Sequence, residues 1–229
     1  MKKVLSIVLK IIIVISSIMG IILSSILKEN DYMGGVTALL YFTIQSNMWI
    51  CLVCLFYLII ELIGFINKKD YYRRWMYIVK YIFTVSITLT GIVFCFVLAP
   101  FMPSDAWTTN NVLTHIVVPL ASIIDLFIDR ASFKYKHSHA MFSLLPPAYY
   151  LVFAIICYVK DVKFAYGLNY PYFFLNFGSP AGIFGFSKES PFIGTFYWII
   201  IMLIMVLAFA YTYLIIHNKT HKEKGLLRN

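Results

Sequence analysis

The chain has 229 residues, of which 61% are hydrophobic, 18% aromatic and only 13% charged, and its mean hydropathy is +0.83. About 25% of the residues of an ordinary soluble domain are charged, so this composition excludes one. Since about 20 apolar residues cross a bilayer, it predicts a protein with several membrane spans. The net charge of +9 would suggest nucleic acid as the partner of a soluble protein. Here the basic residues are divided among four short loops, and we expect no nucleic-acid binding.

Taken in chain order, the apolar stretches predict an all-α membrane protein, a bundle of six transmembrane helices in one domain covering residues 1–229. The first stretch follows two lysines, as in a signal peptide, but its length and the lack of a small-residue cleavage site favour a retained helix. The fourth stretch is shorter than the others and carries a histidine and an aspartate. The predicted spans are approximately residues 4–27, 36–66, 77–99, 112–128, 140–159 and 192–216.

The distribution of positive charge predicts the orientation of these spans. Loops on one side carry 13 of the 19 Lys and Arg residues, and loops on the other side carry four. By the positive-inside rule, both termini should be cytoplasmic. Lys10 and Lys80 fall within spans, near their cytoplasmic ends, and we expect their side chains to extend to the interface.

All four cysteines fall in apolar stretches, which argues against a disulfide framework. Cys51 and Cys54 are spaced as in a Cys-x-x-Cys motif, but no second pair or nearby histidine completes a zinc site. We therefore expect no metal and no cofactor.

Residues 160–191, between the fifth and sixth predicted spans, are rich in aromatic residues and are interrupted by glycines and prolines. Irregular backbone cannot face lipid in the hydrocarbon region. The segment should therefore lie at the membrane interface, as an aromatic loop among the headgroups, or against the bundle, as a lid.

Polar residues inside membrane spans are the most informative positions, because each one needs a partner or a water-filled cavity. Thr43 should lie about 10 Å along the second span, which enters from the outer side. His115 should lie about one turn into the fourth span, which enters from the same side. Asp125 is roughly 15 Å deeper and cannot reach the imidazole in a regular helix. Thr43 and His115 therefore share the outer half of the bundle.

A hydroxyl and an imidazole at one depth are the minimum for nucleophilic acyl transfer, with histidine as the base. Equally, Thr43 can bond to its own helix while His115 joins two helices. Periodicity leaves both interpretations open, because a shared depth does not make two helices neighbours. The candidates for binding substrate or the developing oxyanion are Asn47, Asn111 and Ser46.

Three motifs also resemble a known family. The motifs are Tyr41–Asn47, Asn111–Pro119 with Asp125 following, and Tyr170–Asn176. In order and spacing they resemble the bacterial six-pass branch of the androgen-induced protein and androgen-dependent TFPI-regulating protein family. The family consists of transmembrane threonine hydrolases whose animal members cleave fatty acid esters of hydroxy fatty acids. The resemblance implies Thr43 as nucleophile, His115 as catalytic histidine, and a bacterial cytoplasmic membrane. Asn176 stands where the family has an acidic residue, so a charge at that position is lost.

The leading hypothesis is therefore an intramembrane threonine-dependent hydrolase whose partner is a membrane lipid or fatty acid ester. A lipid acyltransferase is a close variant. A non-catalytic protein that binds or transports a lipid or small solute is the alternative from another class, although the sequence has no internal repeat of the kind many transporters contain. The sequence leaves the oligomeric state open.

Overall fold

The computed structural model describes residues 2–27, 35–102 and 106–226, with side chains as far as residue 220. Within these residues the chain is built of helices, and six of them are long and apolar enough to cross a membrane. This confirms the predicted all-α class and the six helices. Their bounds are Lys2–Ser25, Phe42–Asn67, Arg74–Phe101, Thr109–Ile128, His137–Val159 and Thr195–Thr220.

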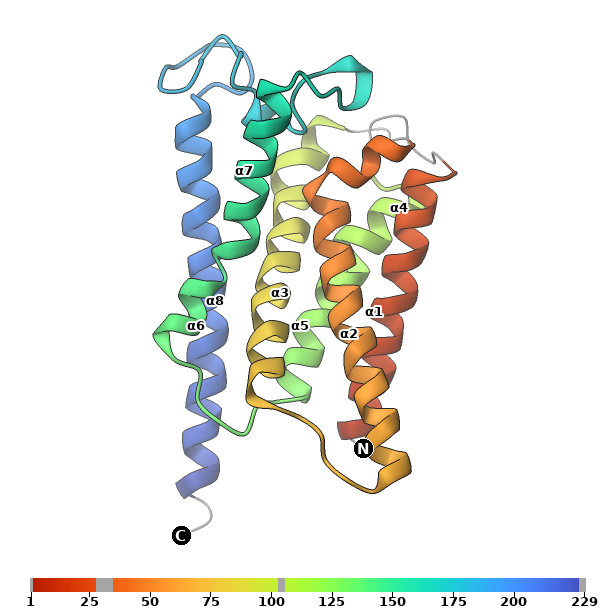
Figure 1. The fold of residues 1–229 in the computed structure, drawn as a ribbon. Helices are drawn as coiled ribbons and strands as arrows, with labels where there is room; N and C mark the ends of the chain where they lie inside the picture. The colour runs from red at the N-terminus through yellow and green to blue at the C-terminus, as the bar shows by residue number, and fades with distance from the viewer. Residues whose placement is uncertain (1, 28–34, 103–105, 227–229) are drawn as a thin grey trace.

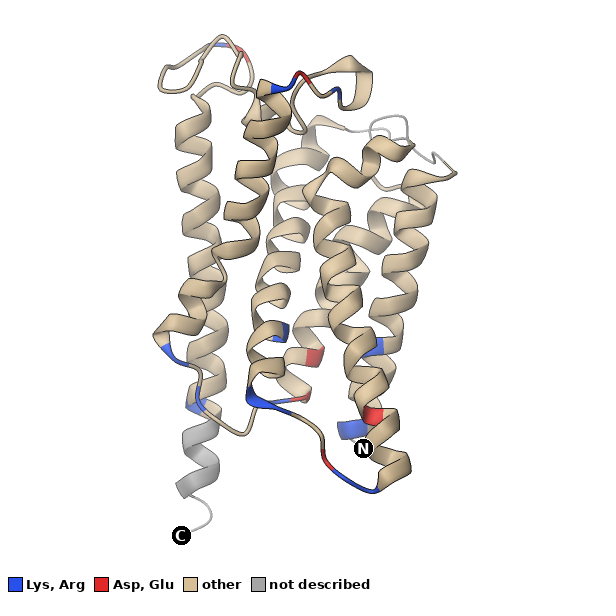
Figure 2. Cartoon of the chain, viewed as in Figure 1, with Lys and Arg blue, Asp and Glu red and all other residues tan. Residues whose placement is uncertain are grey.

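The helices form a bundle in which the start of α1 and the end of α8 lie at the same end (Figure 1). Lysine and arginine gather at that same end, and few lie at the opposite end (Figure 2). The elements in chain order are α1 (Lys2–Ser25), η1 (Val36–Leu40), α2 (Phe42–Asn67), α3 (Arg74–Val93), η2 (Phe94–Leu98), η3 (Ala99–Phe101), α4 (Thr109–Val112), η4 (Leu113–Val117), α5 (Val118–Ile128), α6 (His137–Phe142), α7 (Leu145–Val159), η5 (Ala165–Gly167), η6 (Phe173–Leu175) and α8 (Thr195–Leu226).

The second span begins later than predicted. Residues Val36–Leu40 form a separate short 3₁₀ helix, and the chain is extended at Tyr41, with φ −87° and ψ 143°, before α2 begins at Phe42. The Tyr41 ring packs edge-to-face against Phe164 and Tyr172, with centroids 5.5 and 5.6 Å away. Thr43 therefore lies in the first turn of α2, and the prediction that it lies about 10 Å inside the helix is wrong.

The third and fourth of the six long helices each contain one π-helical turn, η2 and η4. The two spans approach each other closely at Gly91, where an added Cβ would lie 2.7 Å from the backbone oxygen of His115. A side chain at position 91 would push the two backbones apart. Single π turns inside α-helices are frequently found at functional sites; here η4 contains the candidate histidine and η2 lies against it.

Four charged residues form a buried ionic cluster between α1, α3 and the end of α5. The Lys10 ammonium lies 3.2 Å from Asp125 and 3.0 Å from Asp129, and the Lys80 ammonium lies 2.6 and 3.0 Å from the same two carboxylates. The side chains of Lys10 and Lys80 are 0% and 2% exposed, so the prediction that they reach the interface is wrong. Each lysine finds its counterion inside the bundle, which offsets the cost of burying the charge.

Residues 160–191 lie partly against the bundle and partly away from it. Phe164, Tyr172, Phe174 and Leu175 are buried, and the backbone N–H of Ala165 donates to the Tyr41 hydroxyl over 3.1 Å. Farther along, residues 183, 184 and 186 are largely exposed. The first half of the segment thus covers the end of the bundle at which α2 begins (Figure 1).

Candidate active site

The side chains of Thr43 and His115 are in contact. The Thr43 Oγ1 atom lies 3.2 Å from the His115 Nε2 atom, and the residues are 4% and 3% exposed. The first comes from the first turn of α2 and the second from the π turn η4. Thr43 lies in the first turn of α2, and α2 begins farther into the bundle than predicted. Thr43 and His115 therefore still lie at the same depth.

The hydrogen bonds on the other side of the imidazole determine which ring nitrogen carries the proton. His115 Nδ1 lies 3.0 Å from the backbone oxygen of Asn111, which can only accept. It also lies 3.1 Å from the Thr114 hydroxyl, whose own proton is donated to the backbone oxygen of Asn110 over 2.8 Å. Both partners therefore accept a hydrogen bond from Nδ1–H. In the neutral ring Nε2 is then unprotonated and accepts the Thr43 hydroxyl proton.

An aromatic ring covers the imidazole. Phe94, the first residue of η2, stacks on His115 with ring centroids 3.8 Å apart and an interplanar angle of 16°. This contact fixes the plane of the ring and excludes water from one of its faces. The two π turns thus place the histidine and the ring that covers it against each other.

Thr43 also lies beside two hydrogen-bond donors. Its backbone N–H belongs to the first turn of α2 and so has no partner within the helix, and it donates to the Tyr172 hydroxyl oxygen over 3.3 Å. That hydroxyl is 3.5 Å from Thr43 Oγ1. The positive end of the α2 dipole is at the same place, so negative charge on an oxygen near Thr43 would be stabilised from two sides.

The three predicted accessory residues serve mainly to hold the backbone together. The Asn47 amide group donates to the backbone oxygens of Thr43, over 2.8 Å, and Thr114, over 3.2 Å. Ser46 donates to the Thr43 backbone oxygen over 3.0 Å and contacts the Thr90 hydroxyl at 2.7 Å. Asn111 is buried and contributes the backbone oxygen that His115 contacts. Asn47 and Ser46 therefore position α2 against η4 and α3, and both amide protons of Asn47 are already used.

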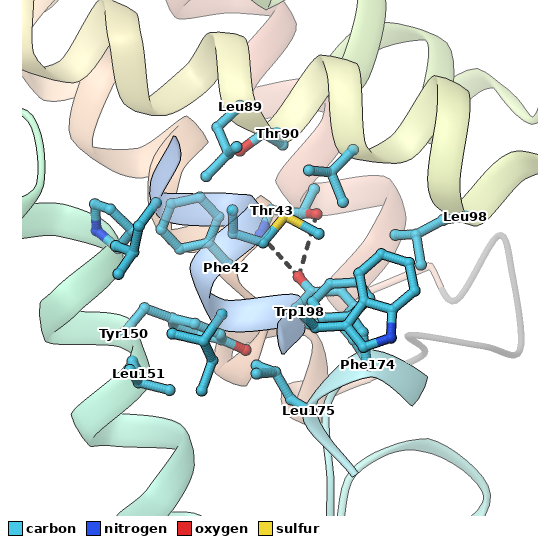
Figure 3. Close-up of a pocket in the computed structure, with 16 residues that line it drawn as sticks. Phe42, Thr43, Leu89, Thr90, Leu98, Tyr150, Leu151, Phe174, Leu175 and Trp198 are labelled. Atoms are coloured by element: carbon cyan, nitrogen blue, oxygen red, sulfur yellow. Dashed lines mark hydrogen bonds between the residues drawn. The ribbon is translucent and has the colours of Figure 1, made fainter. Parts of the chain in front are cut away.

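A small apolar cavity adjoins Thr43 (Figure 3). Its volume is about 90 Å³, and it lies between α2, α3, α7, α8 and the segment around η6. Helices α7 and α8 both pack on α3 but make few contacts with each other. Thr43 lines the cavity and His115 does not, so the hydroxyl stands between the cavity and the imidazole. The side chains that surround it are Phe42, Leu89, Thr90, Val93, Leu98, Pro147, Tyr150, Leu151, Tyr172, Phe174, Leu175, Trp198, Ile199, Met202 and Leu203.

Three residues of this site were not predicted as functional. In the sequence, Tyr172 stands out only as part of the Tyr170–Asn176 motif, and Phe94 and Gly91 look like ordinary residues of an apolar stretch. The only signals in the sequence were the density of aromatic residues in 160–191 and a glycine in the middle of an apolar helix. Asp125 does not reach the imidazole, as predicted; it is paired with the two lysines of the ionic cluster.

Comparison of the chain with family models, curated proteins and solved structures finds no match. What the site can do is therefore argued from its own geometry. The resemblance carried by the three motifs stays a prediction.

Proposed function

We propose that this chain spans a membrane six times with both termini in the cytoplasm, and that Thr43 and His115 hydrolyse an ester of a long-chain lipid in the outer half of the bilayer. Six apolar helices and the gathering of basic residues at one end of the bundle support the orientation. The single observation that carries the activity is the contact between Thr43 Oγ1 and His115 Nε2, the ring nitrogen that the hydrogen bonds of Nδ1 leave as the acceptor.

The reaction would proceed by nucleophilic catalysis. As Thr43 Oγ1 attacks the ester carbonyl carbon, its proton passes to His115 Nε2, and the carbonyl oxygen becomes an oxyanion. The tetrahedral intermediate then expels the alcohol, which takes the proton from Nε2, and leaves an acyl ester on Thr43. Water attacks this ester with His115 again as base, which releases the fatty acid and restores both residues.

The orienting group of the histidine is a carbonyl oxygen, where serine hydrolases of other folds use a carboxylate. The Asn111 oxygen and the Thr114 hydroxyl hold Nδ1–H and keep Nε2 directed at Thr43. A separation of 3.2 Å is slightly longer than the tightest catalytic contacts, as is usual before substrate binds.

Two donors would stabilise the oxyanion. The backbone N–H of a nucleophile is an established component of such sites, and the Thr43 N–H, which donates to the Tyr172 hydroxyl oxygen in this structure, would turn from it to the oxyanion. The Tyr172 hydroxyl is the second, since it lies within 3.5 Å of both the nitrogen and the oxygen of Thr43. Donors in a site without water act more strongly than donors in solution.

The character of the cavity supports a lipid substrate. Its lining is almost wholly aliphatic and aromatic, which suits an acyl chain and not a charged or sugar-like group. Ligand pockets commonly enclose about 300–1,000 Å³, more than the 90 Å³ present. A long chain must therefore extend between α7 and α8 towards the bilayer. The family resemblance suggests fatty acid esters of hydroxy fatty acids as the substrate.

Hydrolysis of a long-chain fluorogenic ester by the purified protein in lipid nanodiscs tests the proposal. Thr43→Ala should abolish turnover, and His115→Ala should lower kcat by about 10²- to 10⁴-fold, the range for a lost general base. The matched control is Thr88→Ala, because Thr88 is also 4% exposed and hydrogen-bonded within α3, but does not line the cavity. Turnover that survives Thr43→Ala would remove threonine from the mechanism.

The apolar cavity also favours one alternative, a protein that binds lipid without reacting with it. Saturable binding of the intact ester, with no released acid and no acylated threonine in the wild-type protein, would support that alternative. Release of the acyl group onto an added lipid alcohol in place of water would identify an acyltransferase.

A further inference from the structure

A second cavity lies at the end of the bundle that carries the two chain ends, far along the helices from Thr43. Its volume is about 590 Å³, within the range of about 300–1,000 Å³ usual for ligand sites. It is formed by the start of α1, the end of α2 with the connection to α3, and the residues around the end of α5. Five basic residues line it: Lys2, Lys3, Lys68, Lys69 and Arg130.

The acidic groups at this cavity are already engaged by other partners. The Asp129 carboxylate lies 3.0 Å from the ammonium groups of both lysines of the ionic cluster. Asp70 accepts the backbone N–H of Tyr72 over 2.9 Å, and Glu61 accepts the Tyr72 hydroxyl proton. By contrast, none of the five basic residues forms an ion pair with the side chains that the structure describes. Asp70 and Glu61 keep their negative charges, because their hydrogen-bond donors are neutral, but the five basic residues outnumber them. The cavity therefore carries a net positive charge.

Apolar side chains extend outward beside these charges. Phe65, which lines the cavity, is 81% exposed, and the neighbouring Ile66 is 67% exposed. In the orientation proposed above they would lie in the inner leaflet. A ligand that fits both features has an anionic head and apolar tails, and basic pockets between helices on the cytoplasmic side are known to bind such headgroups.

We infer that this cavity binds the phosphate group of an anionic membrane lipid, with the acyl chains lying over the exposed end of α2. The inference rests on the proposed orientation in the membrane and is independent of the hydrolase chemistry. Free phosphate offers the same kind of anionic oxygens but makes no contact with the apolar side chains, so the lipid should bind more tightly.

Calorimetric titration of the full-length protein in neutral detergent tests this. The ligands are dioctanoyl-phosphatidylglycerol, the zwitterionic dioctanoyl-phosphatidylcholine and inorganic phosphate. The first should bind at least tenfold more tightly than either of the others. Since a basic residue near an anionic headgroup contributes about fivefold in affinity, Lys68→Ala/Lys69→Ala should weaken binding by about 30-fold.

The matched control is Lys134→Ala/Lys219→Ala, which removes two exposed lysines from the same end of the bundle but outside the cavity. It should change the affinity by less than about threefold. An equal loss in the two double variants, or phosphate binding as tight as the lipid, would overturn the inference. Thr43→Ala should bind the lipid as the wild type does, so failure of the hydrolase proposal would be seen separately.

Discussion

Replacing Asp125 by asparagine is expected to destabilise the fold strongly, because two buried ammonium groups depend on that carboxylate. Lys10 and Lys80 lie 3.2 and 2.6 Å from it, and neither side chain is more than 2% exposed. In Asp125→Asn, Asp129 alone would face both positive charges. Removing one partner of a buried ion pair costs about 3–5 kcal/mol. The folded-to-unfolded ratio should therefore fall by roughly a hundredfold to a few thousandfold.

Asp161→Asn is the matched control for this substitution. Asp161 also pairs with a lysine, at 2.6 Å, but the two side chains are 68% and 53% exposed, and such surface pairs contribute about 0–1 kcal/mol. The free energy of unfolding would be measured by reversible denaturant titration in mixed micelles. Adding Lys80→Met to Asp125→Asn should recover part of the loss, because Lys10 and Asp129 remain paired at 3.0 Å. Equal stability of Asp125→Asn and Asp161→Asn would refute the reasoning.

Three further substitutions test how the site is built. Gly91→Ala should lower kcat/KM for ester hydrolysis at least tenfold, because its Cβ would displace the His115 backbone oxygen 2.7 Å away. Gly178→Ala is the control and should leave kcat/KM unchanged, since its Cβ would have no neighbour closer than 3.4 Å. Equal activities of the two variants would contradict this. Tyr172→Phe should lower kcat by up to about 10²-fold with KM little changed, as for an oxyanion donor, and an unchanged kcat would exclude that role. Asn47→Ala removes two buried hydrogen bonds and should lower the free energy of unfolding by about 1–3 kcal/mol; an unaltered denaturation midpoint would show that these bonds do not hold α2 to η4.

The six helices were predictable because length and apolarity alone determine what can cross a bilayer. The start of the second span was not, since Leu39, Leu40, Tyr41 and Phe42 are all apolar and give no local sign of a break. The contact that ends η1 is a tertiary one, because the Tyr41 ring packs against residues more than 120 positions away in the sequence. The pairing of Lys10 and Lys80 with Asp125 was not predictable for the same reason, because it joins three helices whose arrangement is tertiary.

The candidate site was predictable in its two central residues and not in its surroundings. The structure brings the side chains of Thr43 and His115 within 3.2 Å. Helical spacing predicted their shared depth, although it did so from a second helix that begins at residue 36 and not at Phe42. Their surroundings depend on the two π turns, which shift the register of a helix by one residue and have no reliable sequence signature. The stacking of Phe94 on His115 and the reach of Tyr172 to Thr43 arise from that register and from the fold of residues 160–191.

The most direct test of the catalytic proposal is to find which residue carries the adduct after the purified protein reacts with a fluorophosphonate, by mass spectrometry of its peptides. A hydroxyl that donates its proton to His115 should be the nucleophile. We predict phosphonylation of Thr43 in the wild-type protein, and none at that residue in His115→Ala. An adduct confined to any other side chain, or a Thr43 that stays unmodified while the ester is hydrolysed, would contradict the proposed mechanism.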